Sequence, residues 1–155
     1  MIRLDYAALN YRPSPKARTA MRKALQDIND YPDEHYKELL AALVQRLGMK
    51  KENYLAGNGL DEVIDLVTRA YVREGDEVIV PTPTFSQFAQ AAKRVKAKVV
   101  EVESMKGNLY RINTEKLLLQ ASAKTKIIWL CSPNNPTGTV IAQETIEELA
   151  MNTDA

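Results

Sequence analysis

Apolar residues recur at helical spacing in the first third of the chain and in short runs between turn-forming residues after it. Spacings of three and four positions predict amphipathic helices over 16–27 and 34–47, the second ending at Gly48. Arg12-Pro13-Ser14-Pro15 keeps the segment before the first helix irregular. From residue 51 onward, short runs rich in β-branched residues alternate with helical segments. This alternation predicts an α/β fold with a doubly wound, mostly parallel sheet.

The alternating part is expected to hold four strands and four helices. The strands are predicted over 53–56, 77–80, 98–103 and 126–131, and the helices over 60–73, 84–94, 114–121 and from Ala142 onward. Asn113 is the expected cap of the third helix. The apolar positions of the first helix are expected to face inward: Val63, Ile64, Leu66, Val67 and Ala70. The run 126–131 is predicted to be a central strand buried on both faces, in a sheet that is incomplete.

Composition narrows the function classes. A net charge of +1 without a basic run gives no footprint for nucleic acid. We expect no membrane association, because no apolar stretch approaches the ~20 residues needed to span a bilayer. The amino terminus lacks a signal-peptide pattern, which favours a cytoplasmic location. The single histidine, His35, and the single cysteine, Cys131, do not suffice for a zinc site, and we expect no metal.

Three segments that follow predicted strands carry the candidate chemistry. Ser132-Pro133-Asn134-Asn135-Pro136-Thr137-Gly138-Thr139 leaves the last strand as a stiff loop bearing amide side chains, suited to orienting a planar ligand. Gly57-Asn58-Gly59-Leu60-Asp61-Glu62 opens a helix whose first N–H groups form a site for phosphate. A plain helix cap by Asn58 and Asp61 is the alternative. In Pro81–Phe88, Phe85 either stacks on an aromatic ligand or faces the core with Phe88.

These segments together resemble the fold-type I aminotransferases that use pyridoxal phosphate, in the form typical of histidinol-phosphate aminotransferases. The octapeptide resembles the family's Asn-Pro-Thr-Gly loop, and Gly57–Glu62 resembles its Gly-Asn-Gly-Ser-Asp-Glu. The third segment resembles Pro-x-Pro-Thr-Phe/Tyr-Ser-x-Tyr/Phe. The resemblance runs from Leu4 to Leu149 in the family's order. It implies an arm and helix over 1–30, and over 31–155 the amino-terminal part of the large cofactor-binding domain.

The resemblance assigns roles to individual residues. It implies that the backbone of Gly59, Leu60 and Asp61 holds the cofactor phosphate, that Phe85 stacks on the pyridine ring, and that the Asn135 amide bonds the phenolic oxygen. Leu60 stands where the family usually has serine or alanine. Two further assignments lie in the first third of the chain. Tyr31 would reach the phosphate of a partner's cofactor across a homodimer, and Tyr11 would lie near the substrate.

The resemblance leaves the substrate open and the catalytic set outside this chain. It implies transfer of an amino group between an amino acid and a keto acid or keto phosphate, with histidinol phosphate and 2-oxoglutarate as the expected pair. Ala7-Ala8-Leu9-Asn10 and Arg12 depart from the family pattern around the substrate. Threonine-phosphate decarboxylase, an aromatic aminotransferase and a noncatalytic phosphate- or partner-binding remnant are the alternatives. The family's Schiff-base lysine is expected downstream, so no catalytic residue is assigned here and the chain alone is expected to be inactive.

Three structural expectations follow from the resemblance. The Cα atoms of Gly59, Phe85 and Asn135 should lie within roughly 15 Å of one another at the carboxyl ends of parallel strands. The Asn135–Pro136 peptide bond should be cis. The chain alone should self-associate or be poorly soluble, because an incomplete sheet leaves an edge and apolar helix faces uncovered.

Overall fold

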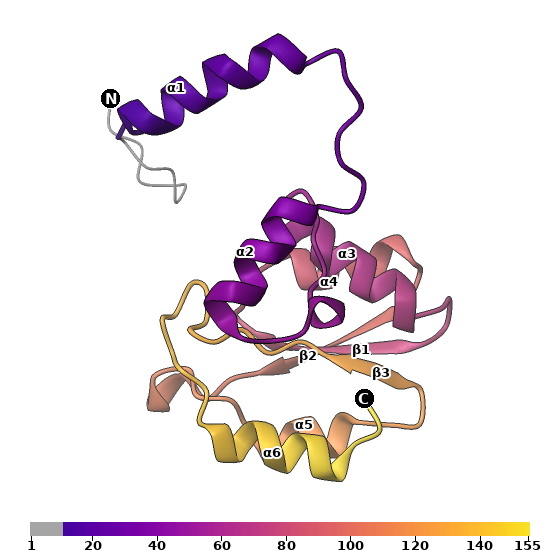
Figure 1. Ribbon diagram of the computed structural model, residues 1–155. Helices are drawn as coiled ribbons and strands as arrows, with labels where there is room; N and C mark the ends of the chain where they lie inside the picture. The colour runs from indigo at the N-terminus through magenta and orange to yellow at the C-terminus, as the bar shows by residue number, and fades with distance from the viewer. Residues whose placement is uncertain (1–10) are drawn as a thin grey trace. The chain divides into compact units, whose positions relative to one another are not determined.

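The computed structural model describes residues 11–155, which fall into two compact units, one ending at Tyr54 and one spanning Leu55–Ala155. Figure 1 traces the chain from the first helices to the sheet and its covering helices. None of the helices within 11–155 is both long and apolar enough to cross a membrane. The tyrosine predicted near the substrate, Tyr11, is the first residue of the described part.

The first unit is helical. It contains α1 (Pro15–Ala24), a 3-10 helix η1 (Leu25–Asp27), α2 (Lys37–Leu47) and a 3-10 helix η2 (Lys51–Asn53). The predicted helix over 16–27 is confirmed as α1 and η1. The Ser14 side chain caps α1 by accepting a hydrogen bond from the Ala17 N–H. Gly48 ends α2 as predicted, with φ of 75°.

The second helix begins three residues later than the predicted 34. Tyr36 takes φ of 46°, a left-handed conformation that a helix interior does not allow. The Asp33 carboxylate then accepts hydrogen bonds from the backbone N–H groups of Lys37 and His35. These bonds stabilise the ionised carboxylate and hold the pKa of Asp33 below its usual value. Asp33 therefore satisfies N–H groups at the start of the helix, which the sequence pattern predicted to begin at 34.

The second unit is a three-stranded parallel sheet with helices on both faces. In chain order it contains α3 (Leu60–Tyr71), β1 (Glu77–Thr82), α4 (Gln87–Arg94), β2 (Lys98–Glu103), η3 (Lys106–Asn108), α5 (Thr114–Gln120), β3 (Thr125–Ile128) and α6 (Gln143–Asn152). The strand order is β2-β1-β3, and both pairings are parallel. The predicted α/β class with a parallel sheet is confirmed. Asn113 caps α5 as expected, accepting from the Lys116 N–H.

Alternate residues of β1 supply the two halves of the core. Val78 and Val80 pack with residues of α3 and α4, including Ile64 and Phe88. Ile79 points to the other face and packs with Leu117 of α5 and with residues of β2 and α6. Because side chains of a strand alternate between faces, a central strand must be apolar at successive positions when both faces are covered. Figure 1 shows α5 and α6 on the face opposite α3 and α4.

Several sequence predictions from residue 51 onward are wrong. The helix predicted over 84–94 begins only at Gln87. Residues 53–56 form no strand: Asn53 ends η2, Tyr54 after it is extended, and the Tyr54 hydroxyl donates to the Leu43 carbonyl. The run 126–131 is shorter, since β3 ends at Ile128, and β3 is an edge strand of the described sheet, with β1 at the centre. Its isoleucines, Ile127 and Ile128, are accordingly only partly buried. Leu66 and Ala70 of α3 are exposed, whereas Ile64 is buried as predicted and Thr68 is buried as well, with its hydroxyl donating to the Ile64 carbonyl.

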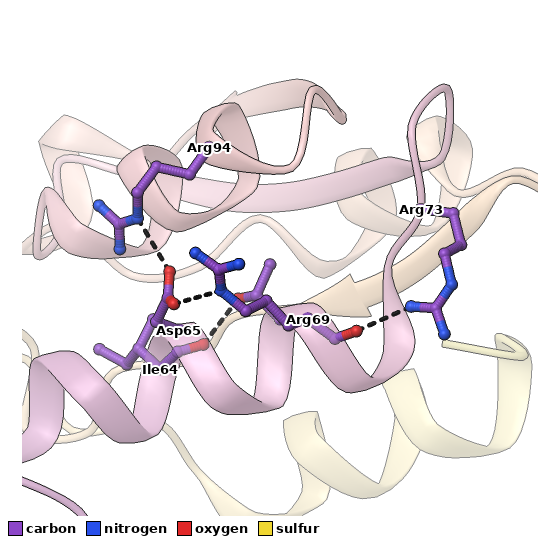
Figure 2. Close-up of polar contacts among 6 residues, drawn as sticks. Ile64, Asp65, Arg69, Arg73 and Arg94 are labelled. Carbon is purple, nitrogen blue, oxygen red and sulfur yellow. Dashed lines mark hydrogen bonds and ion pairs between the residues drawn. The ribbon is translucent and has the colours of Figure 1, made fainter.

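An ionic cluster braces α3 against α4. The Asp65 carboxylate of α3 accepts hydrogen bonds from Arg69 on its own helix and, at 2.9 Å, from the Arg94 Nε of α4. Figure 2 shows both guanidinium groups turned toward the same carboxylate, with Arg73 donating to the Arg69 carbonyl at the end of the helix. The hydrogen bonds from Arg69 and Arg94 hold the pKa of Asp65 below its usual value.

This cluster predicts a stability that depends on pH. Because the pKa of folded Asp65 lies below the value of about 3.9 expected in the unfolded chain, the stabilisation is complete at neutral pH and disappears as the pH falls through the lowered value. Replacing Asp65 with Asn should lower the free energy of unfolding by about 0.5–1 kcal/mol at pH 7, as for partly exposed ion pairs. Urea unfolding at pH 7 and pH 3 measures the difference.

Glu74→Gln is the matched control. Glu74 pairs with Lys96, but both side chains are more than 70% exposed, so its loss should change the stability little at either pH. An Asp65→Asn effect that is equal at pH 7 and pH 3 would contradict the ionic explanation.

Candidate functional site

Two of the three segments that carry the predicted chemistry lie side by side at one edge of the sheet. The loop Pro83–Ser86 follows the carboxyl end of β1, and Ser132–Thr139 follows β3. Because β1 and β3 are parallel neighbours, their carboxyl ends lie side by side. Residues of both loops, with Ser104 and Tyr110 from the segment after β2, line one small cavity of about 20 Å³. The loops after all three strands therefore converge.

The start of α3 lies toward the same edge. Only residues 72–76 separate α3 from β1, so the helix runs antiparallel to the strand that follows it. Its 12 residues span about 18 Å, close to the roughly 20 Å of the six-residue β1. The amino terminus of α3 is thus at the level where β1 ends. We infer from this arrangement that the predicted phosphate segment and the two loops face a common space.

The first turn of α3 offers backbone donors. Gly59 precedes the helix with φ of 81° and ψ of 179°, a conformation that only glycine adopts readily. Within residues 11–155, the N–H groups of Leu60, Asp61 and Glu62 have no acceptor. The two preceding N–H groups differ: that of Asn58 donates to the Glu62 carboxylate, and that of Gly59, which the resemblance assigns to the phosphate, donates to the Gly57 carbonyl at 2.9 Å. Three donors at the positive end of a 12-residue helix dipole suit a phosphate.

The side chain of Leu60 does not close this turn. It is 61% exposed, so its bulk projects into solvent and leaves the backbone N–H accessible. Asp61 is also exposed. The leucine found where the resemblance leads one to expect serine or alanine is therefore compatible with a backbone anion site.

Phe85 combines features of both sequence interpretations. Its ring is partly buried and meets Phe88 edge to face, with centroids 5.8 Å apart and planes at 86°. Phe88 is the core residue of the pair: it is 5% exposed and stacks on Trp129 at 4.9 Å. Phe85 thus packs against the core through Phe88, and part of its surface remains exposed to solvent. A ring held in this way can stack on a flat ligand.

The two neighbouring asparagines differ in their partners. The Asn134 amide is fully engaged, accepting from the Thr84 hydroxyl and donating to the Pro83 carbonyl and the Thr137 hydroxyl. The Asn135 side chain is exposed, and no hydrogen bond joins it to the part of the chain that the structure describes. Of the two amides, Asn135 is the one available to a ligand, as the resemblance implies. The Asn135–Pro136 peptide bond is cis, as predicted.

The role of Asn134 cannot be predicted from the sequence. Asn134 and Asn135 are adjacent and have the same chemistry, and only the fold brings Thr84, fifty positions earlier, beside the first of them. A threonine hydroxyl can both donate and accept, so the threonines of the two loop segments were the available signal.

Tyr11 and Tyr31 belong to the first unit. Both are exposed in the single chain, at 86% and 95%. Their predicted contacts, with the substrate and with a partner's cofactor, stay predictions. The 15 Å limit on the separation of Gly59, Phe85 and Asn135 also stays a prediction.

Comparison with known proteins agrees with this site. The family profile described as "Aminotransferase class I and II" matches residues 1–155. The chain belongs to this aminotransferase family. A curated relative, the histidinol-phosphate aminotransferase of Methanocaldococcus jannaschii, is 38% identical over 92% of the chain and 39% of the relative. The same enzyme of Methanococcoides burtonii is 42% identical with the same coverage. The chain thus spans about two fifths of the length of these relatives.

Solved structures place the fold in the same group. The histidinol-phosphate aminotransferase of Sinorhizobium meliloti, in complex with pyridoxal-5'-phosphate, matches with a TM-score of 0.79 at 25% identity, over 91% of the chain and 38% of that protein. An aspartate aminotransferase of Thermus thermophilus matches with a TM-score of 0.81 at 26% identity, over 96% of the chain and 43% of that protein. The aminotransferase family to which the chain belongs depends on pyridoxal phosphate.

The residues of this chain fit that cofactor. A phosphate needs N–H donors, which the first turn of α3 has; a pyridine ring needs a flat apolar surface, which Phe85 has; and a phenolic oxygen needs a donor, which Asn135 has. Each group lies on a loop or helix end anchored to the sheet. The remaining chemistry of the family needs a lysine, an acid and an arginine. None of these roles is assigned to a residue of the helix start or of the loops after β1 and β3.

Proposed function

We propose that this chain is the amino-terminal part of a pyridoxal-phosphate-dependent aminotransferase and holds one side of the cofactor. The observation that carries the proposal is the first turn of α3, where three N–H groups without acceptors follow a glycine at φ of 81°. The family match and the convergence of the other two loops support it. In this view residues 31–155 belong to the large cofactor-binding domain.

Each group of the site has a separate task. The N–H groups of Leu60, Asp61 and Glu62 hold the phosphate, with the helix dipole adding to the attraction; the Gly59 N–H, also assigned to it by the resemblance, donates to the Gly57 carbonyl instead. Phe85 covers one face of the ring and keeps water from it. The Asn135 amide donates to the phenolic oxygen and so fixes the rotation of the ring in its plane. When bound, pyridoxal phosphate supplies an electron-withdrawing ring that makes transfer of an amino group feasible.

The reaction proposed for the whole protein is movement of an amino group between an amino acid and a keto acid or keto phosphate. The name shared by the curated relatives favours histidinol phosphate, with 2-oxoglutarate as its partner substrate. The likeness to an aspartate aminotransferase supports only the general reaction. Tyr11 is the proposed substrate neighbour. Tyr31 is proposed to serve the phosphate of a second subunit in a homodimer, and the cytoplasmic location stays a prediction.

The test of the cofactor site is binding of pyridoxal phosphate to the 155-residue polypeptide, followed by absorbance and fluorescence. Replacing Asn135 with Ala should weaken binding about 10-fold or more, because a hydrogen bond to a charged oxygen contributes about 1.5–3 kcal/mol. Asn152→Ala is the control: Asn152 is an exposed asparagine of α6 and donates to the Glu148 carbonyl, away from the three loops. Equal affinity in the two variants would contradict the role of Asn135.

The same preparation tests whether the polypeptide is active by itself. We propose that it turns over neither glutamate nor a keto acid, because the resemblance assigns the lysine, acid and arginine of the reaction to positions beyond residue 155. Spectra before and after borohydride reduction, with a turnover assay, provide the measurement. Fixation of the cofactor on one lysine together with turnover would contradict this proposal. Binding without turnover is the expected result.

A further inference from the structure

Three loops at the carboxyl edge of the sheet are joined by a single line of hydrogen bonds. The line begins at Thr84 after β1, passes through Asn134 and two threonines after β3, and ends at the Leu109 carbonyl after β2. The bonded pair Thr84 and Asn134 is separated by fifty positions in the sequence. Because no strand pairing joins the loops after β1 and β3 to each other, side-chain hydrogen bonds are main polar links that fix one against the other.

Asn134 is the junction of this line. Its Nδ2 donates at 2.9 Å to the Pro83 carbonyl, which accepts only, so the orientation of the amide is determined. The Oδ1 therefore faces the Thr84 hydroxyl and accepts from it at 2.6 Å. The second Nδ2 hydrogen goes to the Thr137 hydroxyl at 2.8 Å. The side chain thus uses both donors and its acceptor within the line.

The direction of the remaining bonds is also determined. The Leu109 carbonyl accepts only, so the Thr139 hydroxyl donates to it, at 2.7 Å. Thr139 must then accept from the Thr137 hydroxyl at 3.0 Å, and Thr137 must accept from Asn134. Every hydroxyl has one hydrogen, and each is used once. In this line every donor hydrogen points the same way along the chain of bonds, so each bond depends on its neighbours. Such a line is stiffer than a set of independent contacts, because changing one bond disturbs the others.

The backbone closes the same loop. The Asn134 N–H donates to the Thr139 carbonyl at 2.8 Å, and the Gly138 N–H donates to the Asn134 carbonyl at 2.7 Å. Gly138 has φ of 71°, which the reversal of the chain requires. Asn134 therefore fixes both the base of its own loop and the distance of that loop from β1.

The line runs beside the proposed cofactor contacts and shares no residue with them. Thr84 precedes Phe85, and Asn134 precedes Asn135. Holding the first member of each pair fixes the backbone from which the second projects. The three loops leave a cavity of only about 20 Å³ between them, so little room remains for one to shift relative to another.

We propose that Thr84, Asn134, Thr137 and Thr139 form a clamp that couples the three loops and sets the position of the Phe85 ring relative to the Asn135 amide. These four are positioning residues, since none is proposed to touch the cofactor. The coupling of the loops stands on the hydrogen bonds alone. The effect on pyridoxal phosphate rests on the proposed function.

The test compares Thr137→Val, which removes the middle hydroxyl, with Thr137→Ser, which keeps it. Backbone hydrogen exchange is measured at Gly138, in the loop of the substitution, and at Phe88, whose N–H donates to the Phe85 carbonyl after β1. Binding of pyridoxal phosphate and of inorganic phosphate is measured in parallel. Thr145→Val, at the start of α6 and outside the line, is the matched control.

Thr137→Val should raise exchange about 10-fold at Gly138 and also at Phe88, because the loss of one bond frees both loops. It should weaken pyridoxal phosphate about 5- to 10-fold while leaving inorganic phosphate, which needs only α3, within about twofold. Thr137→Ser and Thr145→Val should stay within about twofold of the unchanged chain in every measurement.

The outcomes separate the clamp from the proposed function. Unchanged exchange at Phe88 in Thr137→Val, or failure of Thr137→Ser to restore it, would overturn the clamp. Coupled exchange in a chain that binds no pyridoxal phosphate would support the clamp and overturn the proposed function. Binding of pyridoxal phosphate that is equal in both Thr137 variants would support the function and overturn the positioning role.

Discussion

Replacing Gly59 with Ala is expected to lower the free energy of unfolding by about 1–3 kcal/mol and to weaken binding of inorganic phosphate about 10-fold. The backbone at Gly59 has φ of 81° and ψ of 179°, a region that a residue with a Cβ avoids. A variant that relaxes this strain must turn the peptide that leads into α3. The N–H groups of the first turn would then no longer point to one anion.

Gly107→Ala is the matched control for Gly59. An added Cβ meets nothing within 4 Å at either position, so steric contact is equal in the two variants. The difference lies in the backbone, because Gly59 has a positive φ and Gly107 does not. Thermal unfolding and phosphate titration of both variants provide the measurement. Equal losses in the two would show that the conformation of Gly59 carries no special cost.

Replacing Ile79 with Ala is expected to cost about 2–5 kcal/mol of stability, the range for emptying a fully buried aliphatic site. Ile79 is 0% exposed and packs with Val102, Leu117 and Leu149 on the face covered by α5 and α6. Against a total of about 5–15 kcal/mol for a domain, such a loss unfolds a large part of the population at modest urea concentration. Urea unfolding followed by circular dichroism measures it.

Leu119→Ala is the control for the core substitution. Leu119 lies in the same α5 that covers Ile79, but it is 74% exposed, so the expected change is below about 0.5 kcal/mol. A loss at Ile79 no larger than that at Leu119 would mean that the sheet does not have its core where the structure places it.

Periodicity predicted most of the elements because local pattern and tertiary burial agree there. Strand 98–103 and the helix capped by Asn113 were placed at or within one residue of their observed bounds. The pattern was insufficient where burial depends on distant partners. Residues 53–56 are mostly apolar, yet they pair with no strand of the described sheet. The run 126–131 is as apolar as a central strand, yet β1 takes the central place.

The candidate site was predictable to the extent that it consists of strand-end loops. Phosphate donors at a helix start and an amide on a proline-rich loop can be inferred from residue type and order. The choice between Asn134 and Asn135 rested on resemblance, because both have the same chemistry. Only the fold brings Thr84 beside Asn134 and thereby separates the residue that holds the loops from the residue left for a ligand.

The proposed function requires that pyridoxal phosphate bind between the start of α3 and the loops that follow β1 and β3. Two-dimensional NMR of the isotope-labelled 155-residue polypeptide, titrated with pyridoxal phosphate, tests it most directly. We expect pyridoxal phosphate to shift the NMR signals of three sets of groups: the Leu60, Asp61 and Glu62 amides, the Phe85 ring and the Asn135 side-chain amide. Inorganic phosphate should shift only the signals of the α3 amides. Saturable binding that shifts lysine side chains or the first unit, and leaves the first turn of α3 unchanged, would contradict it.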